Sequence, residues 1–159
     1  MGKLKLDDLD HQILDILIDN ARVPFTDISK RLLISAGTVH VRVKKMEDAG
    51  IIKGSSLNLD YEKLGYSFIA YIGVYLEKNN LTQQVLKSLE SIPYITVAHI
   101  TTGKFNIYCK LRARDTKHAK DLIFMIDDIE GISRTETMIS LEDSINDKKR
   151  LMHNIFTDL

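Results

Sequence analysis

The hydrophobic periodicity of the chain changes near residue 66, and this change limits the folds that the chain can adopt. Before it, apolar residues recur at helical spacing, as in residues 9–18. After it, they alternate along residues 66–76 with bulky side chains on both faces, which is typical of a strand within a sheet. We therefore expect an α+β protein. Its segments are a helical domain (residues 1–57), a linker (58–65), a domain of strands and helices (66–143) and a helical extension (144–159).

The first domain is predicted to hold three helices and a small hairpin. We expect the helices over residues 9–18, from Pro24 to about residue 32, and over residues 36–49. Ser35 is a favourable N-cap, and Gly50 suits the left-handed position after a helix. Residues 51–57 predict a short strand that turns at Gly54. Two helices joined by a short turn and followed by a hairpin form a winged helix-turn-helix.

Charge is unevenly distributed in this domain. The whole chain is neutral, with 22 Lys and Arg against 22 Asp and Glu. Residues 30–54 nevertheless hold six basic residues against two acidic ones, whereas residues 7–27 hold one basic residue against six acidic ones. A basic segment in a neutral protein predicts docking to a polyanion, the alternative being a solvated helix face.

The third helix is predicted to enter the major groove of DNA. Val39, Val43 and Met46 share one face and predict its buried stripe. The candidate DNA-binding residues lie around the rest of the helix and at its start: Ser35, Gly37, Thr38, His40, Val41, Arg42, Lys44 and Lys45.

The outward side chains of this helix suit different contacts. Thr38 can bond a base edge, and Val41 can touch a thymine methyl group. Arg42 and the two lysines that follow it can neutralise phosphates. Two alternatives stay open: Val41 is an ordinary exposed valine, and Arg42 forms an ion pair with Glu47 or with an Asp of the first helix.

The second half of the chain predicts the order β-α-β-β-α-β. We expect strands over residues 66–76, 94–102, 105–112 and 132–141, and helices over about residues 85–92 and 116–129. This order is the ferredoxin-like split motif, in which two helices cover one face of a sheet. Alternation turns Ile107, Cys109 and Leu111 toward the helices.

The other face of this sheet is predicted to be bare in a single subunit. Alternation gives it Tyr71, Tyr75, Asn106, Tyr108, Lys110, Met138 and Ser140. An open sheet with several Tyr and Met residues is usually covered by another chain. We therefore expect a homodimer formed through the sheets.

The sequence shows no enzyme signature. It lacks a Gly-rich phosphate loop, a nucleophile elbow and a pair of His residues at metal-ligand spacing. The single cysteine, Cys109, is predicted to be an inert core thiol. We expect no catalytic residue, no metal site and no cofactor. The chain has no apolar stretch of the length that spans a bilayer and no secretory signal, so we expect a cytoplasmic protein.

Several motifs occur in a fixed order: LDDLDHQILDIL, the break NARV, ISAGTVHVRVKKMEDAGIIKG, LDYEKLGY, TTGKFNIYCKL and GISRTETMIS. In this order and spacing, residues 6–143 resemble the Lrp/AsnC (feast/famine) family of transcriptional regulators. The resemblance implies a winged-helix DNA-binding domain and a ferredoxin-like effector and assembly domain. It also implies dimers that associate further, often to octamers.

The resemblance further implies an amino-acid effector in a cleft between dimers. The residues implied are those of one turn and of the last strand: Thr102, Gly103, Lys104, Phe105, Asn106, Thr137, Met138, Ile139 and Ser140. Backbone N–H groups at Gly103 can take a carboxylate, and Met138 and Ile139 can line a side-chain pocket. Many members carry an acidic residue where this chain has Asn106, and a neutral amide pairs more weakly with a ligand ammonium. Members of the family also usually carry a glycine in the turn before the third helix, where this chain has Leu33.

Other functions remain to be distinguished. An architectural protein would bind DNA without responding to any ligand. A regulatory subunit of a metabolic enzyme would have no use for the basic third helix. RNA binding by the winged helix is also open, although the predicted sheet lacks the aromatic ribonucleoprotein motif.

Overall fold

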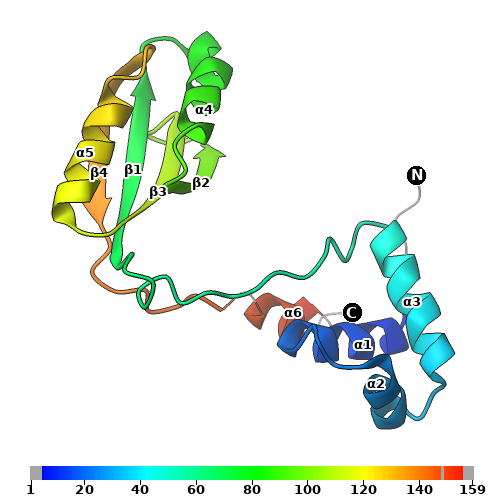
Figure 1. Ribbon diagram of the computed structural model, residues 1–159. Coiled ribbons are helices and arrows are strands. Elements are labelled where there is room, and N and C mark those ends of the chain that lie inside the picture. Colours follow the sequence, from blue (N-terminus) through cyan, green and yellow to red (C-terminus); the bar gives the residue numbers. More distant parts are fainter. Residues whose placement is uncertain (1–4, 148, 156–159) are drawn as a thin grey trace. The chain divides into compact units, whose positions relative to one another are not determined.

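The computed structural model describes residues 5–147 and 149–155, and the chain forms two compact units (Figure 1). The helical unit comprises the residues up to Asn58 together with those from Ile145 onward. The sheet unit comprises residues 59–144. Its first residues form consecutive turns, with backbone hydrogen bonds from Gly65 to Glu62 and from Tyr66 to Tyr61.

The helical unit is built from α1 (Asp8–Asp19), α2 (Phe25–Leu32), α3 (Ala36–Asp48) and the short α6 (Arg150–Ile155). The three helices predicted in the first domain are confirmed. Apolar residues at helical spacing meet in one core, where the side chains of Ile13, Ile28, Val39, Val43 and Met46 are buried. This packing fixes which face of α3 is left outside.

The helix ends follow their capping residues. Asp7 begins α1 in a capping box, because its side chain accepts from the Asp10 amide and its own amide donates to the Asp10 carboxylate. Ser35 caps α3 as predicted, and Gly50 adopts a φ of 70° beyond its end. Leu33, in the turn between α2 and α3, has a φ of 55° although it is not glycine.

The strand predicted over residues 51–57 is wrong. The structure gives these residues two bends followed by coil, with no strand pairing. The amides of Ile51 and Ile52 both donate to the carbonyl oxygen of Met46, at 2.9 and 3.2 Å. These two amides therefore terminate α3 and are not available for a strand ladder.

The C-terminal extension belongs to the helical unit. Met152 of α6 packs against the core of this unit, and Lys149 Nζ lies 2.9 Å from a carboxylate oxygen of Asp19 on α1. The apolar residues that predict a helical extension are Ile145, Leu151, Met152, Ile155 and Phe156. Phe156 and the side chain of Ile155 lie outside the described residues. No helix in the described part of the chain has the length and hydropathy of a membrane span.

The sheet unit has the predicted β-α-β-β-α-β order. Its elements are β1 (Phe68–Leu76), a 3-10 turn η1 (Asn79–Leu81), α4 (Thr82–Glu90), β2 (Ile95–Ile100), β3 (Ile107–Ala113), α5 (Thr116–Asp127) and β4 (Ile132–Ile139). The strands are antiparallel in the order β2-β3-β1-β4. β1 is therefore an interior strand, with β3 on one side and β4 on the other.

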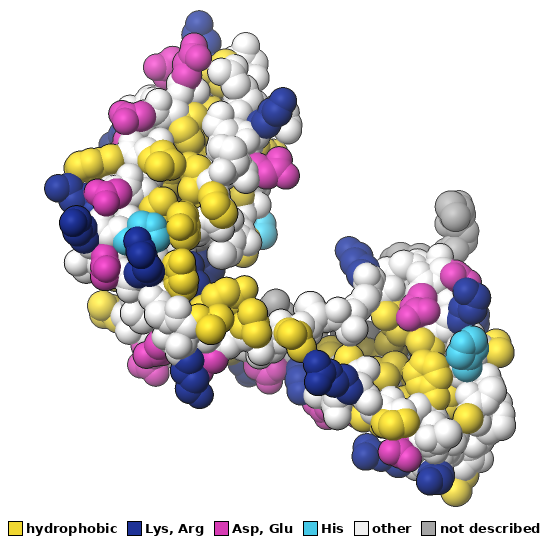
Figure 2. All heavy atoms as spheres, viewed as in Figure 1, with side chains coloured by type: hydrophobic (Ala, Val, Ile, Leu, Met, Phe, Trp, Pro, Cys, Tyr) yellow, Lys and Arg dark blue, Asp and Glu magenta, His cyan; other side chains and the backbone are white. Residues whose placement is uncertain are grey.

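The two faces of the sheet differ as alternation predicts. Ile107, Cys109 and Leu111 are fully buried in a core that they share with residues of α4 and α5. On the opposite face, the rings of Tyr71 and Tyr108 stack at 5.7 Å between centroids and remain partly exposed. Figure 2 shows hydrophobic side chains gathered on the visible surface of the sheet unit, with charged side chains around them.

Candidate functional site

The outer face of α3 presents small, apolar and basic residues to solvent. Val41 is 66% exposed, and Gly37 is exposed one turn before it. At the start of the helix, Ser35 Oγ accepts from the Thr38 amide at 3.0 Å and lies 2.9 Å from Thr38 Oγ1. Capping therefore fixes the position of both hydroxyl groups at the end of the helix where an N-terminal dipole favours anions.

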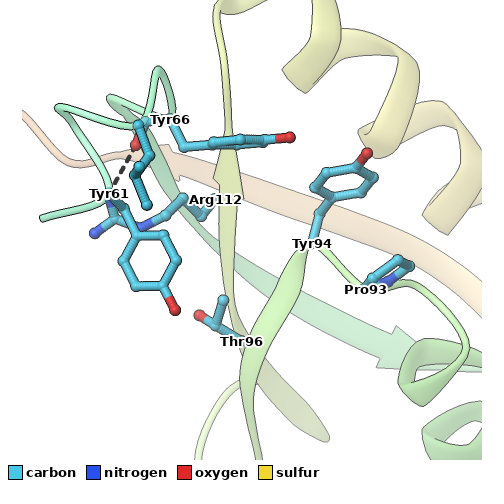
Figure 3. A pocket seen from close by; sticks show the side chains of 7 residues that line it. Tyr61, Tyr66, Pro93, Tyr94, Thr96 and Arg112 are labelled. Atoms are coloured by element: carbon cyan, nitrogen blue, oxygen red, sulfur yellow. Dashed lines mark hydrogen bonds between the residues drawn. The ribbon is translucent and has the colours of Figure 1, made fainter. Parts of the chain in front are cut away.

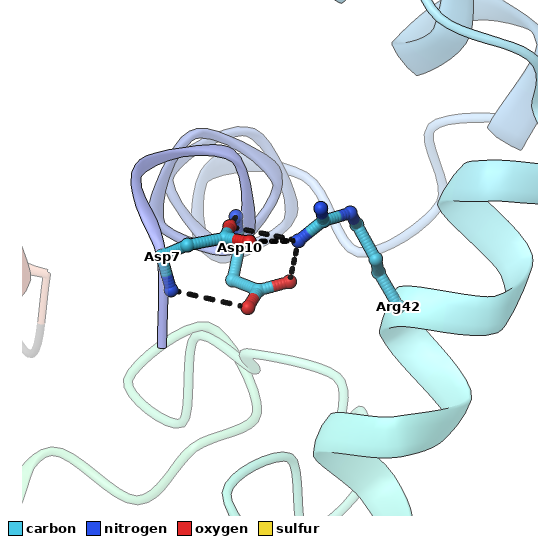
Figure 4. A network of polar contacts seen from close by, with 3 residues as sticks. All are labelled: Asp7, Asp10 and Arg42. Atoms are coloured by element: carbon cyan, nitrogen blue, oxygen red, sulfur yellow. Dashed lines mark hydrogen bonds and ion pairs between the residues drawn. The ribbon is translucent and has the colours of Figure 1, made fainter. Parts of the chain in front are cut away.

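Arg42, which we expected to contact a phosphate, forms ion pairs within the helical unit. Its Nη1 atom lies 2.7 Å from both carboxylate oxygens of Asp7 and 2.7 Å from Oδ1 of Asp10 (Figure 4). The alternative prediction of an ion pair with an Asp of the first helix is confirmed, and Glu47 is not its partner. The contact joins the middle of α3 to the start of α1.

The ion pair between Arg42 and Asp10 is partly shielded from solvent. The Asp10 side chain is 1% exposed and the Arg42 side chain 25% exposed. The hydrogen bond from Arg42 lowers the pKa of the Asp7 carboxyl from 3.8 to about 2, and the same contact raises the pKa of Arg42. Both groups thus stay charged at neutral pH and hold the two helices together.

The lysines of α3 remain available at the surface. Lys44 Nζ lies 3.8 Å from a carboxylate oxygen of Asp48, and both side chains are about two-thirds exposed, so this ion pair is weak. Lys45 is exposed. His40 is also exposed, and its ring meets the edge of Phe25 at 6.1 Å. Three residues of α3 are predicted to contact phosphates. Arg42 is paired with Asp7 and Asp10, whereas Lys44 and Lys45 are not.

The turn between β2 and β3 is held firmly at both of its ends. The Thr101 hydroxyl donates to the carbonyl oxygen of Phe105, and the Thr101 amide donates to that of Asn106. The Asn106 side chain accepts from the Leu76 amide at 3.0 Å and donates to Asn79 Oδ1 at 2.9 Å. Asn106 thus uses both amide atoms to fasten the turn to the end of β1.

Phe105 lies on the open face of the sheet, over Gly73. A Cβ atom at residue 73 would lie 2.3 Å from the Phe105 ring, so only glycine allows this contact. The ring packs by its edge against Tyr75 at 5.4 Å and stacks on Tyr108 at 5.9 Å. The exposed part of the turn is therefore limited to Thr102, Gly103 and Lys104.

A charged cluster lies beside this turn, and sequence analysis missed its central residue. Lys104 Nζ lies 2.7 Å from Glu136 Oε2, Tyr75 Oη donates to Glu136 Oε1 at 2.9 Å, and Arg134 lies 3.4 Å from the same oxygen. Lys104 lowers the pKa of Glu136 and has its own pKa raised in return. Alternation along β4 from Met138 could have placed Glu136 on this face.

The predicted effector residues of β4 do not lie together. Thr137 and Ile139 line a small apolar cavity of about 190 Å³ beside α5, whereas Met138, opposite Tyr71, belongs to the other face. Within one subunit Met138 and Ile139 point to opposite faces, because neighbours on a strand alternate. That they line one pocket in a cleft between dimers stays a prediction. The Ser140 amide donates to Ile69. This end of β4 pairs with the start of β1, whereas the turn at Asn106 is fastened to the end of β1.

Cys109 lies in the core of the sheet unit, as predicted. It is fully buried, and burial raises the pKa of its thiol to about 11. Among the described residues, no group of three or more His, Cys, Asp or Glu side chains is placed to hold a metal ion.

Comparisons with known proteins agree with both units. Residues 6–53 match the model of a winged helix-turn-helix DNA-binding domain, and residues 69–149 match that of the Lrp/AsnC ligand binding domain. The regulatory protein AsnC of Haemophilus influenzae is 37% identical over 141 residues, which cover 88% of this chain and 94% of that protein.

Solved structures show the same fold. The structure of Escherichia coli AsnC superposes with a TM-score of 0.87 at 34% identity, covering 91% of this chain and 97% of that one. A feast or famine regulatory protein from M. tuberculosis, complexed with L-methionine, shares the fold at 22% identity, with a TM-score of 0.83 and coverage of 91% and 97%. From the matches of both domains and from these relatives, the chain belongs to the Lrp/AsnC family of transcriptional regulators.

Proposed function

We propose that this regulator binds its operator through the outer face of α3, and that an amino acid modulates the binding. The observation that carries the DNA part is the exposed row formed by Gly37, Val41, Lys44 and Lys45. The opposite face of α3 is the core of the helical unit, so this row is the surface that α3 can offer to a groove.

The residues of this row have separate roles in the proposal. Thr38 and Val41 read base edges, and Lys44 and Lys45 neutralise phosphates. Ser35 and His40 flank the groove, and Arg42 supports the helix from behind through α1. Because DNA is the partner, we further propose that the protein acts in the cytoplasm.

The DNA part is tested by fluorescence anisotropy on operator and random duplexes at several salt concentrations. Lys45→Ala is expected to weaken binding to every sequence and to reduce the salt slope by about one. Val41→Ala is expected to cost about 1–3 kcal/mol on the operator alone. Lys87→Ala, on an exposed site of α4, is the matched control. Equal losses from Lys45→Ala and Lys87→Ala would contradict docking through α3.

The effector part rests on the family and on the exposed turn. One relative of this fold is described as complexed with L-methionine, and the family's domain model is a ligand-binding domain. We propose that the ligand carboxylate meets the backbone at Thr102, Gly103 and Lys104. We propose that Asn106 holds the turn in place and that another group binds the ligand ammonium, since both Nδ2 and Oδ1 of Asn106 have partners within the subunit.

A complete effector site needs more than one subunit in this proposal. The turn and residues 137–140 lie at different positions along β1, so a second copy would have to bring one set to the other. The partly exposed Tyr71, Tyr108 and Lys110, with Met138 at 41% exposure, form a face suited to dimerisation. We propose a homodimer through this face that assembles to an octamer or a related ring.

The effector part is tested by a thermal-shift screen of the full chain against the twenty amino acids, followed by light scattering and DNA binding with each hit. A ligand that raises the melting temperature, changes the oligomer and alters operator affinity supports the proposal. If none of the twenty shifts the melting temperature at millimolar concentration while DNA binding persists, the protein is a ligand-independent architectural regulator.

A further inference from the structure

A second cavity lies in the sheet unit, far from the turn at Asn106. It measures about 220 Å³ and opens at the end of the sheet where β1 begins (Figure 3). Its lining residues come from the first turns of the sheet unit, from β2 with the residues before it, and from β3: Tyr61, Leu64, Tyr66, Pro93, Tyr94, Thr96 and Arg112. Arg112 pairs with Ile69 near the start of β1, whereas Asn106 is fastened to Leu76 at its end.

The walls of this cavity are mainly aromatic. The rings of Tyr66 and Tyr94 stack at 6.2 Å between centroids with 26° between their planes. Tyr94 is in turn supported by His118 of α5, whose ring meets it edge-on at 4.6 Å. Tyr61 contributes a third ring from the turn. Such walls favour a flat, single-ring ligand, because a cavity of this size is below the usual range for larger molecules.

Arg112 is the one charged residue of the lining. Its Nη1 donates to the Tyr66 carbonyl oxygen at 2.8 Å, and its Cζ lies 5.1 Å from the centre of the Tyr61 ring. A guanidinium has five N–H donors, and among the described residues this is the one side-chain hydrogen bond of Arg112. The nearby Asp60 carboxylate is held by the amide and Nζ of Lys63, at 3.1 and 3.2 Å. The guanidinium thus has donors left for an anion.

We propose that this cavity binds a small aromatic carboxylate, with the ring against the tyrosines and the carboxylate on Arg112. Charge complementarity and the fork of donors on Arg112 favour a carboxylate over a neutral or cationic ligand. The site is separate from the amino-acid site proposed at the turn. Because Tyr61 and Leu64 follow directly on the helical unit in the chain, a ligand here holds this connecting segment against β2 and β3.

The test is calorimetric titration of the full chain with benzoate, with benzamide as the neutral probe of the same shape. Benzoate is expected to bind at least tenfold more tightly than benzamide. Arg112→Gln is expected to remove this preference, and Tyr61→Ala, at a side chain on the surface, to weaken benzoate at least fivefold. Benzoate is also expected to slow hydrogen exchange in residues 60–66.

The matched control is Lys104→Ala at the turn, which is expected to leave benzoate binding unchanged. The proposal is overturned by absence of benzoate binding at millimolar concentration, by equal affinity for benzamide, or by loss of binding in Lys104→Ala. If Arg112→Gln fails to fold, as circular dichroism would show, Tyr61→Ala decides: unchanged benzoate affinity in that variant overturns the proposal.

Discussion

Replacing Arg42 by Met tests whether this arginine holds α3 against α1. The substitution keeps the apolar stem and removes the guanidinium that bonds Asp7 and Asp10. The Asp10 carboxylate then stays buried with one described donor, the Asp7 amide at 3.2 Å. An unpaired buried charge is the expected source of instability.

The size of the effect follows from the exposure of the partners. Removing one partner of a buried ion pair costs about 3–5 kcal/mol. The Arg42 side chain keeps 25% exposure, so we expect the lower end, about 3 kcal/mol. The matched control is Lys44→Met, where the pair with Asp48 is exposed on both sides and is worth about 0.2–1 kcal/mol.

Hydrogen exchange of peptides from α1 and α3 measures this opening separately from the sheet unit. Arg42→Met should raise exchange in both helices, and Asp10→Asn in the same background should restore part of the protection. Under conditions where Arg42→Met is folded, its salt slope for DNA should match that of the parent protein. A loss below 1 kcal/mol, or one equal to that of Lys44→Met, would refute the structural role.

The same contact predicts a pH dependence. The folded-state pKa of Asp7 is about 2, below its ordinary value of 3.8, with the hydrogen bond from Arg42 as the largest cause. A lowered pKa means that the contribution to stability is complete above about pH 4 and is lost as the pH falls toward 2. The difference in urea stability between Arg42→Met and the parent protein should therefore shrink between pH 5 and pH 2.5, and a constant difference would exclude Asp7 as its source.

Three further substitutions or reactions test local features. Leu33→Asn should stabilise the helical unit by about 1 kcal/mol in urea, because Leu33 is 92% exposed and has a φ of 55°. Gly73→Ala should destabilise the sheet unit by about 1–3 kcal/mol by displacing Phe105, and the loss should be smaller in a Phe105→Ala background. Cys109 should react with a thiol reagent at pH 8 only as fast as the protein unfolds, since its thiol is buried with a pKa of about 11.

Much of the fold could be predicted from the sequence because its elements have strong local signals. Period-two alternation predicts that Ile107, Cys109 and Leu111 face the helices, and Ser35 predicts the start of α3. The hairpin after α3 could not be excluded in this way. Residues 51–57 have strand-like composition at their start. However, the amides of Ile51 and Ile52 donate to the carbonyl oxygen of Met46 at the end of α3. Composition alone does not predict these hydrogen bonds.

The candidate sites were harder to predict, because side-chain partners come from distant parts of the chain. Arg42 could have bound a phosphate or an acidic residue, and only the packing of α1 on α3 brings Asp7 and Asp10 to it. Glu136 lies 32 residues from Lys104, and their contact depends on the way the turn folds beside β4. Charge on a helix face is thus weak evidence for DNA contact until intramolecular partners are known.

Asn106 shows how a departure from a family pattern can have a structural reason. Its position requires one atom that accepts from the Leu76 amide and one that donates to Asn79. A carboxylate could also accept from the Leu76 amide, but Asn79 would then have to turn its own side-chain amide and donate to it. A carboxylate that contacts the exposed turn is Glu136, which already pairs with Lys104. An amino acid at this turn must therefore compete with Lys104 for Glu136, or find its acidic partner on another subunit.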